Sequence, residues 1–141
     1  MKKILLILIL GIGIMLSGCE GIATLPDNPQ APTEASAKYR KITAEQAKNT
    51  MDETDGWILL DVRTDEEFEE ERIEGAILIP DYEISVRVES ELPEKDAVIL
   101  IYCRSGRRSA LAANEMVDRD YTNVYDFGGI IDWPYETISG K

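Results

Sequence analysis

The chain has 141 residues, 44% of them hydrophobic and 30% charged, which suits one compact domain and is too short for two ordinary ones. Fifteen Lys and Arg residues against 27 Asp and Glu residues give a net charge of −12, so a nucleic-acid backbone would be repelled and nucleic acid is excluded as an expected partner. The sequence contains no histidine and only two cysteines, which excludes Ser-His and Cys-His catalytic pairs, histidine-ligated zinc and a four-thiolate metal site, and we expect neither a metal nor a cofactor.

The amino-terminal residues have the pattern of a bacterial export signal. Lys2 and Lys3 precede an apolar run over residues 4–16, which is shorter than the roughly 20 apolar residues of a spanning helix. The run ends in Leu-Ser-Gly and Cys19, which resembles a lipobox and implies that residues 1–18 are a signal peptide and that Cys19 is acylated. We therefore expect a lipid anchor on the extracytoplasmic side of a bacterial membrane, in the cell envelope; an uncleaved signal anchor is the alternative.

Residues 19–38 differ in composition from the rest of the chain. They include Pro26, Pro29 and Pro32 among small and polar residues, with too few large apolar side chains to form a core. This composition predicts a flexible tether, followed by a folded domain over residues 39–141.

Helical and strand patterns alternate through the predicted domain. Thr43 and Gln46, and again Thr64 and Glu67, have the spacing of a capping box, which predicts two helix starts. Short apolar runs and turn residues mark the strands between the helices. We expect helices over residues 43–53, 65–71, 81–91 and 109–117, and strands over residues 57–62, 76–79, 97–102 and 123–125.

This alternation predicts an α/β fold, a three-layer sandwich in which helices cover both faces of a small parallel sheet. Residues 97–102 form the most hydrophobic stretch of the predicted domain. A strand of this composition is typical of the sheet centre, with a neighbour on each side.

Cys103 directly follows this central strand and precedes a predicted helix. In open α/β sheets, ligands bind in the loops beyond the carboxyl ends of the strands. The segment Arg104-Ser105-Gly106-Arg107-Arg108 could place amide groups and the positive end of the helix around a thiolate. Its arginines favour a small anionic substrate. The alternative is that Cys103 is an ordinary buried cysteine.

The lack of a histidine base favours reactions in which a thiolate attacks directly, and transfer of a sulfane sulfur meets this condition. Four ordered sequence blocks resemble the single-domain rhodaneses, or thiosulfate sulfurtransferases. The resemblance covers residues 42–136, and its blocks are LDVR with EEF (60–68), IEGA with IP (73–80), YCRSGRRS (102–109) and GGI with Trp133.

The resemblance implies a fold, a reaction and a set of site residues. It implies a rhodanese-like sandwich in which Cys103 is the nucleophile and carries a persulfide, taking sulfur from thiosulfate or a related donor to a thiophilic acceptor. Gly106 supplies the tight turn of the catalytic loop and Arg108 faces the loop or the anionic substrate. Asp61 and Arg63 resemble the supporting pair of the family, although a purely structural salt bridge fits them equally well. The loop and substrate-binding residues implied are Arg104, Ser105, Gly106, Arg107, Arg108 and Ser109.

Two features depart from the family pattern, and one alternative function stays open. Arg72 stands where many members carry a histidine, and the predicted lipid anchor differs from the common cytosolic location, so a protein acceptor is left open. A cysteine phosphatase is disfavoured because it needs five residues between cysteine and arginine, whereas four separate Cys103 from Arg108. A disulfide oxidoreductase is disfavoured because the chain has no Cys-x-x-Cys motif. The alternative is a membrane-tethered sulfur-carrier or binding module without independent turnover.

Overall fold

The structure, a computed structural model, describes residues 39–140 of the chain. The predicted signal peptide over residues 1–18, the predicted tether over residues 19–38 and the predicted lipid site Cys19 lie outside these residues and stay predictions. Within residues 39–140, no helix is both long enough and apolar enough to cross a membrane.

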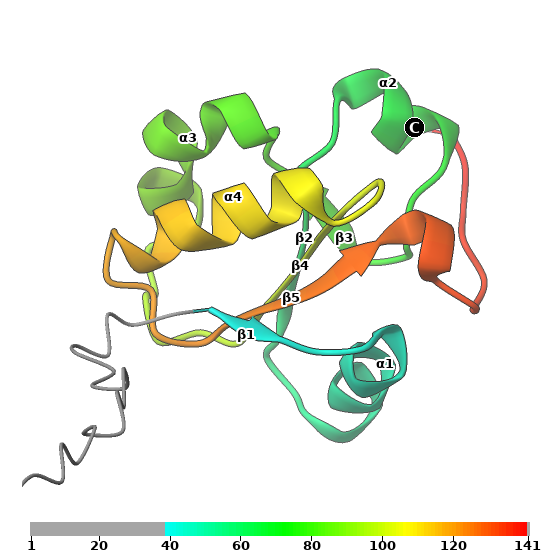
Figure 1. The fold of residues 1–141 in the computed structure, drawn as a ribbon, viewed down its shortest axis with the longest axis horizontal. Helices are drawn as coiled ribbons and strands as arrows, with labels where there is room; N and C mark the ends of the chain where they lie inside the picture. Colours follow the sequence, from blue (N-terminus) through cyan, green and yellow to red (C-terminus); the bar gives the residue numbers. More distant parts are fainter. Residues whose placement is uncertain (1–38, 141) are drawn as a thin grey trace, which may run out of the picture. The chain divides into compact units, whose positions relative to one another are not determined.

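One sheet of five parallel strands forms the centre of the fold, in the order β1-β5-β4-β2-β3 (Figure 1). Strand β4 pairs with β2 on one side and with β5 on the other, so the most hydrophobic segment is central, as predicted. The predicted parallel α/β architecture is confirmed. The strands are β1 (Arg40–Lys41), β2 (Ile58–Asp61), β3 (Ala76–Leu78), β4 (Ile99–Cys103) and β5 (Val124–Gly129).

Two of the α-helices begin at the capping boxes that the sequence predicts. The side chain of Thr43 accepts the Gln46 amide and that of Thr64 accepts the Glu67 amide, and both capping boxes are complete. Short 3-10 helices at Asp81–Glu83 and Ile130–Asp132 follow β3 and β5. The α-helices are α1 (Ala44–Glu53), α2 (Asp65–Glu70), α3 (Ile84–Glu91) and α4 (Arg107–Val117).

Helices α3 and α4 cover one face of the sheet and α1 covers the other (Figure 1). Successive side chains of β4 alternate between these faces, because a strand has a period of two. Ile101 and Cys103 pack with Met116 of α4, whereas Leu100 and Tyr102 pack in a second cluster with Ala47 of α1. The Cys103 side chain therefore packs on the α4 face.

Several boundaries differ from the sequence-based expectation. Helix α4 begins at Arg107, two residues before the expected start, because Gly106 adopts φ +93° and serves as its N-cap. Arg107 and Arg108 are therefore part of the first turn of the helix. Segment 81–91 begins as a 3-10 turn, and the two-residue strand β1 was not expected.

Candidate active site

Cys103 is the last residue of β4 and lies at the carboxyl edge of the sheet, as the sequence predicted. Its side chain is buried, and the Gly106 amide donates a hydrogen bond to Sγ at 3.0 Å. The first turn of α4 starts at the next residue, so its amide groups, which have no acceptors within the helix, add positive potential near the sulfur. This environment favours a sulfur atom that carries negative charge.

Gly129 of β5 allows the loop over residues 103–106, here called the Cys103 loop, to pack against the sheet. A Cβ atom on Gly129 would lie 2.3 Å from the Arg104 carbonyl oxygen and 2.7 Å from Ser105 Cα, so a side chain has no space there. The register between β4 and β5 shifts at this point, since Ile101 is opposite Asp126 and Cys103 is opposite Gly129. The loop therefore packs directly on the backbone of β5, at the point where the pairing between β4 and β5 becomes irregular.

Ser109 and Asp126 form a buried contact behind the loop. The Ser109 hydroxyl donates a hydrogen bond of 2.7 Å to Asp126 Oδ1, which also accepts the Gly128 amide at 3.0 Å. The other oxygen, Asp126 Oδ2, is buried without a hydrogen-bond partner among the described residues. Ser109 thus supports the loop from within. The sequence reasoning did not identify Asp126, because the expected strand ended at residue 125 and the observed β5 continues through Gly129.

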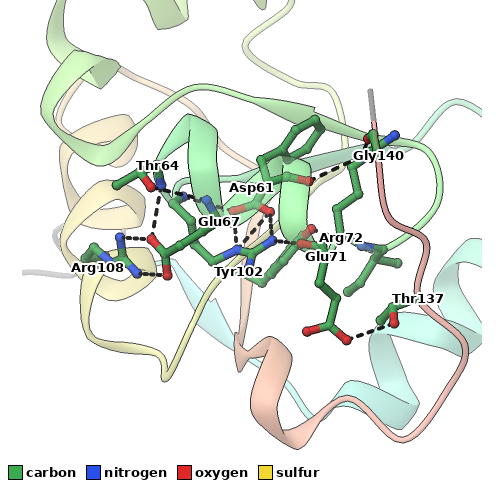
Figure 2. A network of polar contacts seen from close by, with 12 residues as sticks. Asp61, Thr64, Glu67, Glu71, Arg72, Tyr102, Arg108, Thr137 and Gly140 are labelled. Atoms are coloured by element: carbon green, nitrogen blue, oxygen red, sulfur yellow. Dashed lines mark hydrogen bonds and ion pairs between the residues drawn. The ribbon is translucent and has the colours of Figure 1, made fainter.

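Arg108 is joined to Glu67 of α2. Its two terminal nitrogens donate to the two carboxylate oxygens at 2.7 and 2.8 Å (Figure 2). The hydrogen bond with Glu67 and then the Glu67 charge raise the pKa of Arg108, and the nearby Cys103 raises it further. Arg108 is therefore a cation held close to the thiol, and Glu67 is a site residue whose contact the sequence reasoning missed.

Asp61 and Arg63 form a buried ion pair at the end of β2. Both side chains are almost inaccessible to solvent, and Arg63 donates to Asp61 through its backbone amide and its guanidinium, at 2.6 to 3.0 Å. Burial alone would lower the pKa of Arg63, but the hydrogen bond and charge of Asp61 raise it. Arg63 also donates to the Glu71 carbonyl oxygen. These contacts support a structural role for the pair.

Tyr102, which the sequence reasoning did not single out, lies beside this pair. Burial, reinforced by the charge of Asp61, raises its pKa, so its hydroxyl stays protonated and accepts the Ile73 amide.

The remaining loop side chains face solvent. Arg104, Ser105 and Arg107 are exposed, and Arg104 lines a cavity of about 320 Å³ with Arg63 and Glu67. Glu67 therefore lines this cavity with Arg104 and also pairs with Arg108. A larger cavity of about 730 Å³ lies between α1 and residues 133–136 and contains none of the predicted site residues. Among the described residues, no group of three or more suitable side chains could hold a metal ion.

Comparisons with known proteins agree with this arrangement. The model of the rhodanese-like domain matches residues 43–134. Thiosulfate sulfurtransferase PspE of Escherichia coli K12 is 34% identical over 84 residues, which are 60% of this chain and 79% of PspE. YrkF of Bacillus subtilis, whose name describes a sulfur carrier protein, is 35% identical over 106 residues, 74% of this chain and 56% of YrkF. The solved structure of a rhodanese with anions from E. coli superposes with a TM-score of 0.56 at 32% identity, covering 60% of this chain and 99% of that one.

Proposed function

The chain belongs to the rhodanese-like domain family and is a sulfurtransferase of the rhodanese type, and we propose that it works through a persulfide on Cys103. In the loading step, the Cys103 thiolate attacks the outer sulfur of thiosulfate or a related donor. The donor S–S bond breaks, sulfite leaves with the electron pair, and the outer sulfur stays on Sγ. A thiophilic acceptor then removes this sulfur and Cys103 leaves as a thiolate.

The observation that carries this proposal is the position of the Cys103 sulfur. It lies at the carboxyl end of the central strand, accepts the Gly106 amide at 3.0 Å and adjoins the start of α4. An amide and a helix amino terminus stabilise an anion without accepting a proton. They suit a reaction in which the sulfur alternates between thiolate and persulfide and no histidine takes part.

The arginines near Cys103 support an anionic sulfur donor. Arg104 and Arg107 are exposed on either side of Gly106 and have no side-chain partner among the described residues. A thiosulfate dianion that approaches the sulfur therefore meets two free cations, whereas the Arg108 cation is shared with Glu67. The donor class rests on this charge distribution and on the named activity of PspE.

Intact-mass measurement of the full chain tests the persulfide. Incubation with thiosulfate should add one sulfur atom to the protein, and cyanide should remove it and release thiocyanate. The variant Cys103→Ser should gain no sulfur while keeping its circular dichroism spectrum. A wild-type protein that stays unmodified, or a Cys103→Ser variant that gains sulfur, would refute the proposal.

A carrier without independent turnover is the second candidate function. It is favoured by the similarity to YrkF and by the fact that Cys103 is the only cysteine among residues 39–140, so no second thiol is placed to discharge it there. Steady-state assays with thiosulfate and cyanide separate the candidates. An enzyme reloads from thiosulfate and releases many equivalents of thiocyanate per Cys103, whereas a carrier that needs another protein to load it releases at most the one equivalent it already holds.

We also propose that acylated Cys19 anchors the protein on the extracytoplasmic side of a bacterial membrane. The support is the lipobox-like sequence after a short apolar run. Cys19→Ser should prevent both acylation of the protein and cleavage of its signal peptide. Metabolic labelling with a fatty acid would detect the loss of acylation, and membrane fractionation would detect the loss of the lipid anchor. Equal membrane binding and equal size of wild type and variant, without label in either, would instead support an uncleaved anchor.

A further inference from the structure

The cavity beside the Cys103 loop combines opposite charges with an apolar wall. Its volume is about 320 Å³, and one of its lining residues, Arg104, follows Cys103 directly in the chain. The cavity is lined by Arg63, Glu67, Glu70, Glu71, Arg104, Ile130 and Ile131.

Three of the five charged groups in this cavity already have partners. Arg63 is paired with Asp61 and Glu67 is paired with Arg108. The Glu71 carboxylate accepts the Thr137 hydroxyl at 2.9 Å (Figure 2). Because these three side chains already have partners, less of their charge and hydrogen-bonding capacity is available to a ligand.

The two other charged groups, Arg104 and Glu70, are free. Neither side chain has a hydrogen bond or an ion pair within residues 39–140, although both line the same cavity. Ile131, which is 64% exposed, supplies an apolar surface next to them. The cavity therefore offers one cation, one anion and an apolar wall to a single small ligand.

We propose that this cavity binds the sulfur acceptor and that the acceptor is an α-amino-acid thiol. Its carboxylate pairs with Arg104, its ammonium group pairs with Glu70, and its short carbon chain lies against Ile131. A molecule of this size needs only part of the cavity volume. The inference rests on the proposed function, because it concerns discharge of the Cys103 persulfide.

The transfer step balances without a further reactant. The outer sulfur of the persulfide lies about 2.05 Å beyond Sγ, and the acceptor thiolate attacks this atom. A bond forms between the acceptor sulfur and the outer sulfur, while the bond between the outer sulfur and Sγ breaks and its electron pair stays on Cys103. The acceptor sulfur is oxidised and the Cys103 sulfur is reduced, and the products are an amino-acid persulfide and the free thiolate.

Single-turnover discharge of the loaded full chain tests the two charge contacts separately. The probes are L-cysteine, cysteamine, which lacks the carboxylate, and 3-mercaptopropionate, which lacks the ammonium group. Loss of sulfur from Cys103 is followed by intact mass, at equal thiolate concentrations. Glu70→Gln should lower the preference for L-cysteine over 3-mercaptopropionate by about threefold to tenfold, the range for a partly exposed charged contact. Arg104→Gln should lower the preference for L-cysteine over cysteamine by a similar factor.

Ratios of rates within one variant cancel differences in loading and in general thiol reactivity. Glu53→Gln on α1 removes an exposed carboxylate far along the chain from the loop and should leave both ratios unchanged. Glu70→Lys should shift the preference further toward 3-mercaptopropionate, which confirms the sign of the contact. If the variants load with thiosulfate and discharge to cyanide but both ratios match wild type, this inference is wrong and the proposed function stands. Failure of wild-type Cys103 to load would refute both.

Discussion

Arg108 and Glu67 connect the first turn of α4 to the first turn of α2 through a two-point ion pair. The nitrogen-to-oxygen distances are 2.7 and 2.8 Å, and Glu67 also accepts the Thr64 amide at 3.2 Å (Figure 2). One carboxylate thus completes the capping box of α2 and fixes the arginine next to the Cys103 loop. Glu67 links the stability of α2 to the charge near Cys103.

Replacing Glu67 by Gln should make the stability difference from wild type depend on pH. The Arg108 hydrogen bond lowers the pKa of Glu67 from 4.5 to about 2, although burial opposes the shift. A depressed folded-state pKa stabilises the protein fully above pH 4.5, and this stabilisation is lost as the pH falls toward 2. We expect Glu67→Gln to cost about 1–3 kcal/mol at pH 7, since partial exposure screens the pair, while the Gln side chain keeps the capping box.

Urea unfolding at pH 7, 4 and 3 measures this dependence. The difference in the free energy of unfolding between wild type and Glu67→Gln should be smaller at pH 4 and pH 3 than at pH 7. Glu45→Gln, which removes an exposed carboxylate from the first turn of α1, should show a smaller effect at pH 7. A gap for Glu67→Gln that is the same at all three values would contradict the assignment.

The features that could be predicted from the sequence are those fixed by local residues. The capping boxes at Thr43 and Thr64 depend on side chains three positions apart, and the central strand depends on a continuous apolar run, so local sequence predicts both. Cys103 was located in the same way, from its place after that strand. Strand β1 was missed because two exposed residues carry no pattern, and its pairing depends on β5 more than 80 residues away in the chain.

Contacts between distant segments account for what the sequence did not predict at the site. Glu67 and Arg108 are 41 positions apart, and Ser109 and Asp126 are 17 apart. Each of these acidic residues could equally be a solvated side chain on the basis of local sequence. Only the packing of α2 and β5 around the loop brings them to their partners.

Asp61→Asn should destabilise the protein by about 3–5 kcal/mol, because it leaves the buried Arg63 guanidinium without its counter-charge. Asp61 has no exposed surface and Arg63 is 3% exposed, so solvent cannot replace the lost contact. Thermal and urea unfolding measure the loss. Asp52→Asn, which breaks the exposed pair with Lys48, is the matched control and should cost less than about 1 kcal/mol. Equal costs for the two variants would contradict the structural role of Asp61.

Arg72→Ala should loosen the carboxyl-terminal segment and leave sulfur transfer unchanged. The Arg72 guanidinium lies 4.9 Å from the Phe68 ring and donates to the Phe68 and Gly140 carbonyl oxygens. Its contacts are therefore with α2 and with the carboxyl-terminal segment. We expect a loss of about 1–2 kcal/mol.

Amide hydrogen exchange gives the local readout for Arg72→Ala. The amides of Ile138 and Gly140 donate to the Arg72 and Glu69 carbonyl oxygens at 2.8 Å, and both should exchange faster in the variant. Lys48→Ala, which removes a cation 5.9 Å from the Tyr135 ring, is the control and should leave these two amides protected. A large fall in the rate of sulfur transfer with unchanged exchange would instead indicate a role for Arg72 in the reaction.

Gly129→Ala should impair sulfur transfer far more than Gly128→Ala, although the two glycines are adjacent. A methyl group on Gly129 would meet backbone atoms of the loop, 2.3 Å from the Arg104 carbonyl oxygen, so the loop next to Cys103 must move. A methyl group on Gly128 meets nothing within 4 Å, and its cost is the positive φ of +93°, about 1–2 kcal/mol of backbone strain. A displacement near 1 Å at a reacting group can lower a rate by about 10²-fold, so Gly129→Ala should reduce kcat/KM for thiosulfate by that order.

Gly128→Ala is the control: its free energy of unfolding in urea should fall, with a much smaller effect on kcat/KM. Equal kinetic losses would show that the contact between Gly129 and the loop does not position Cys103.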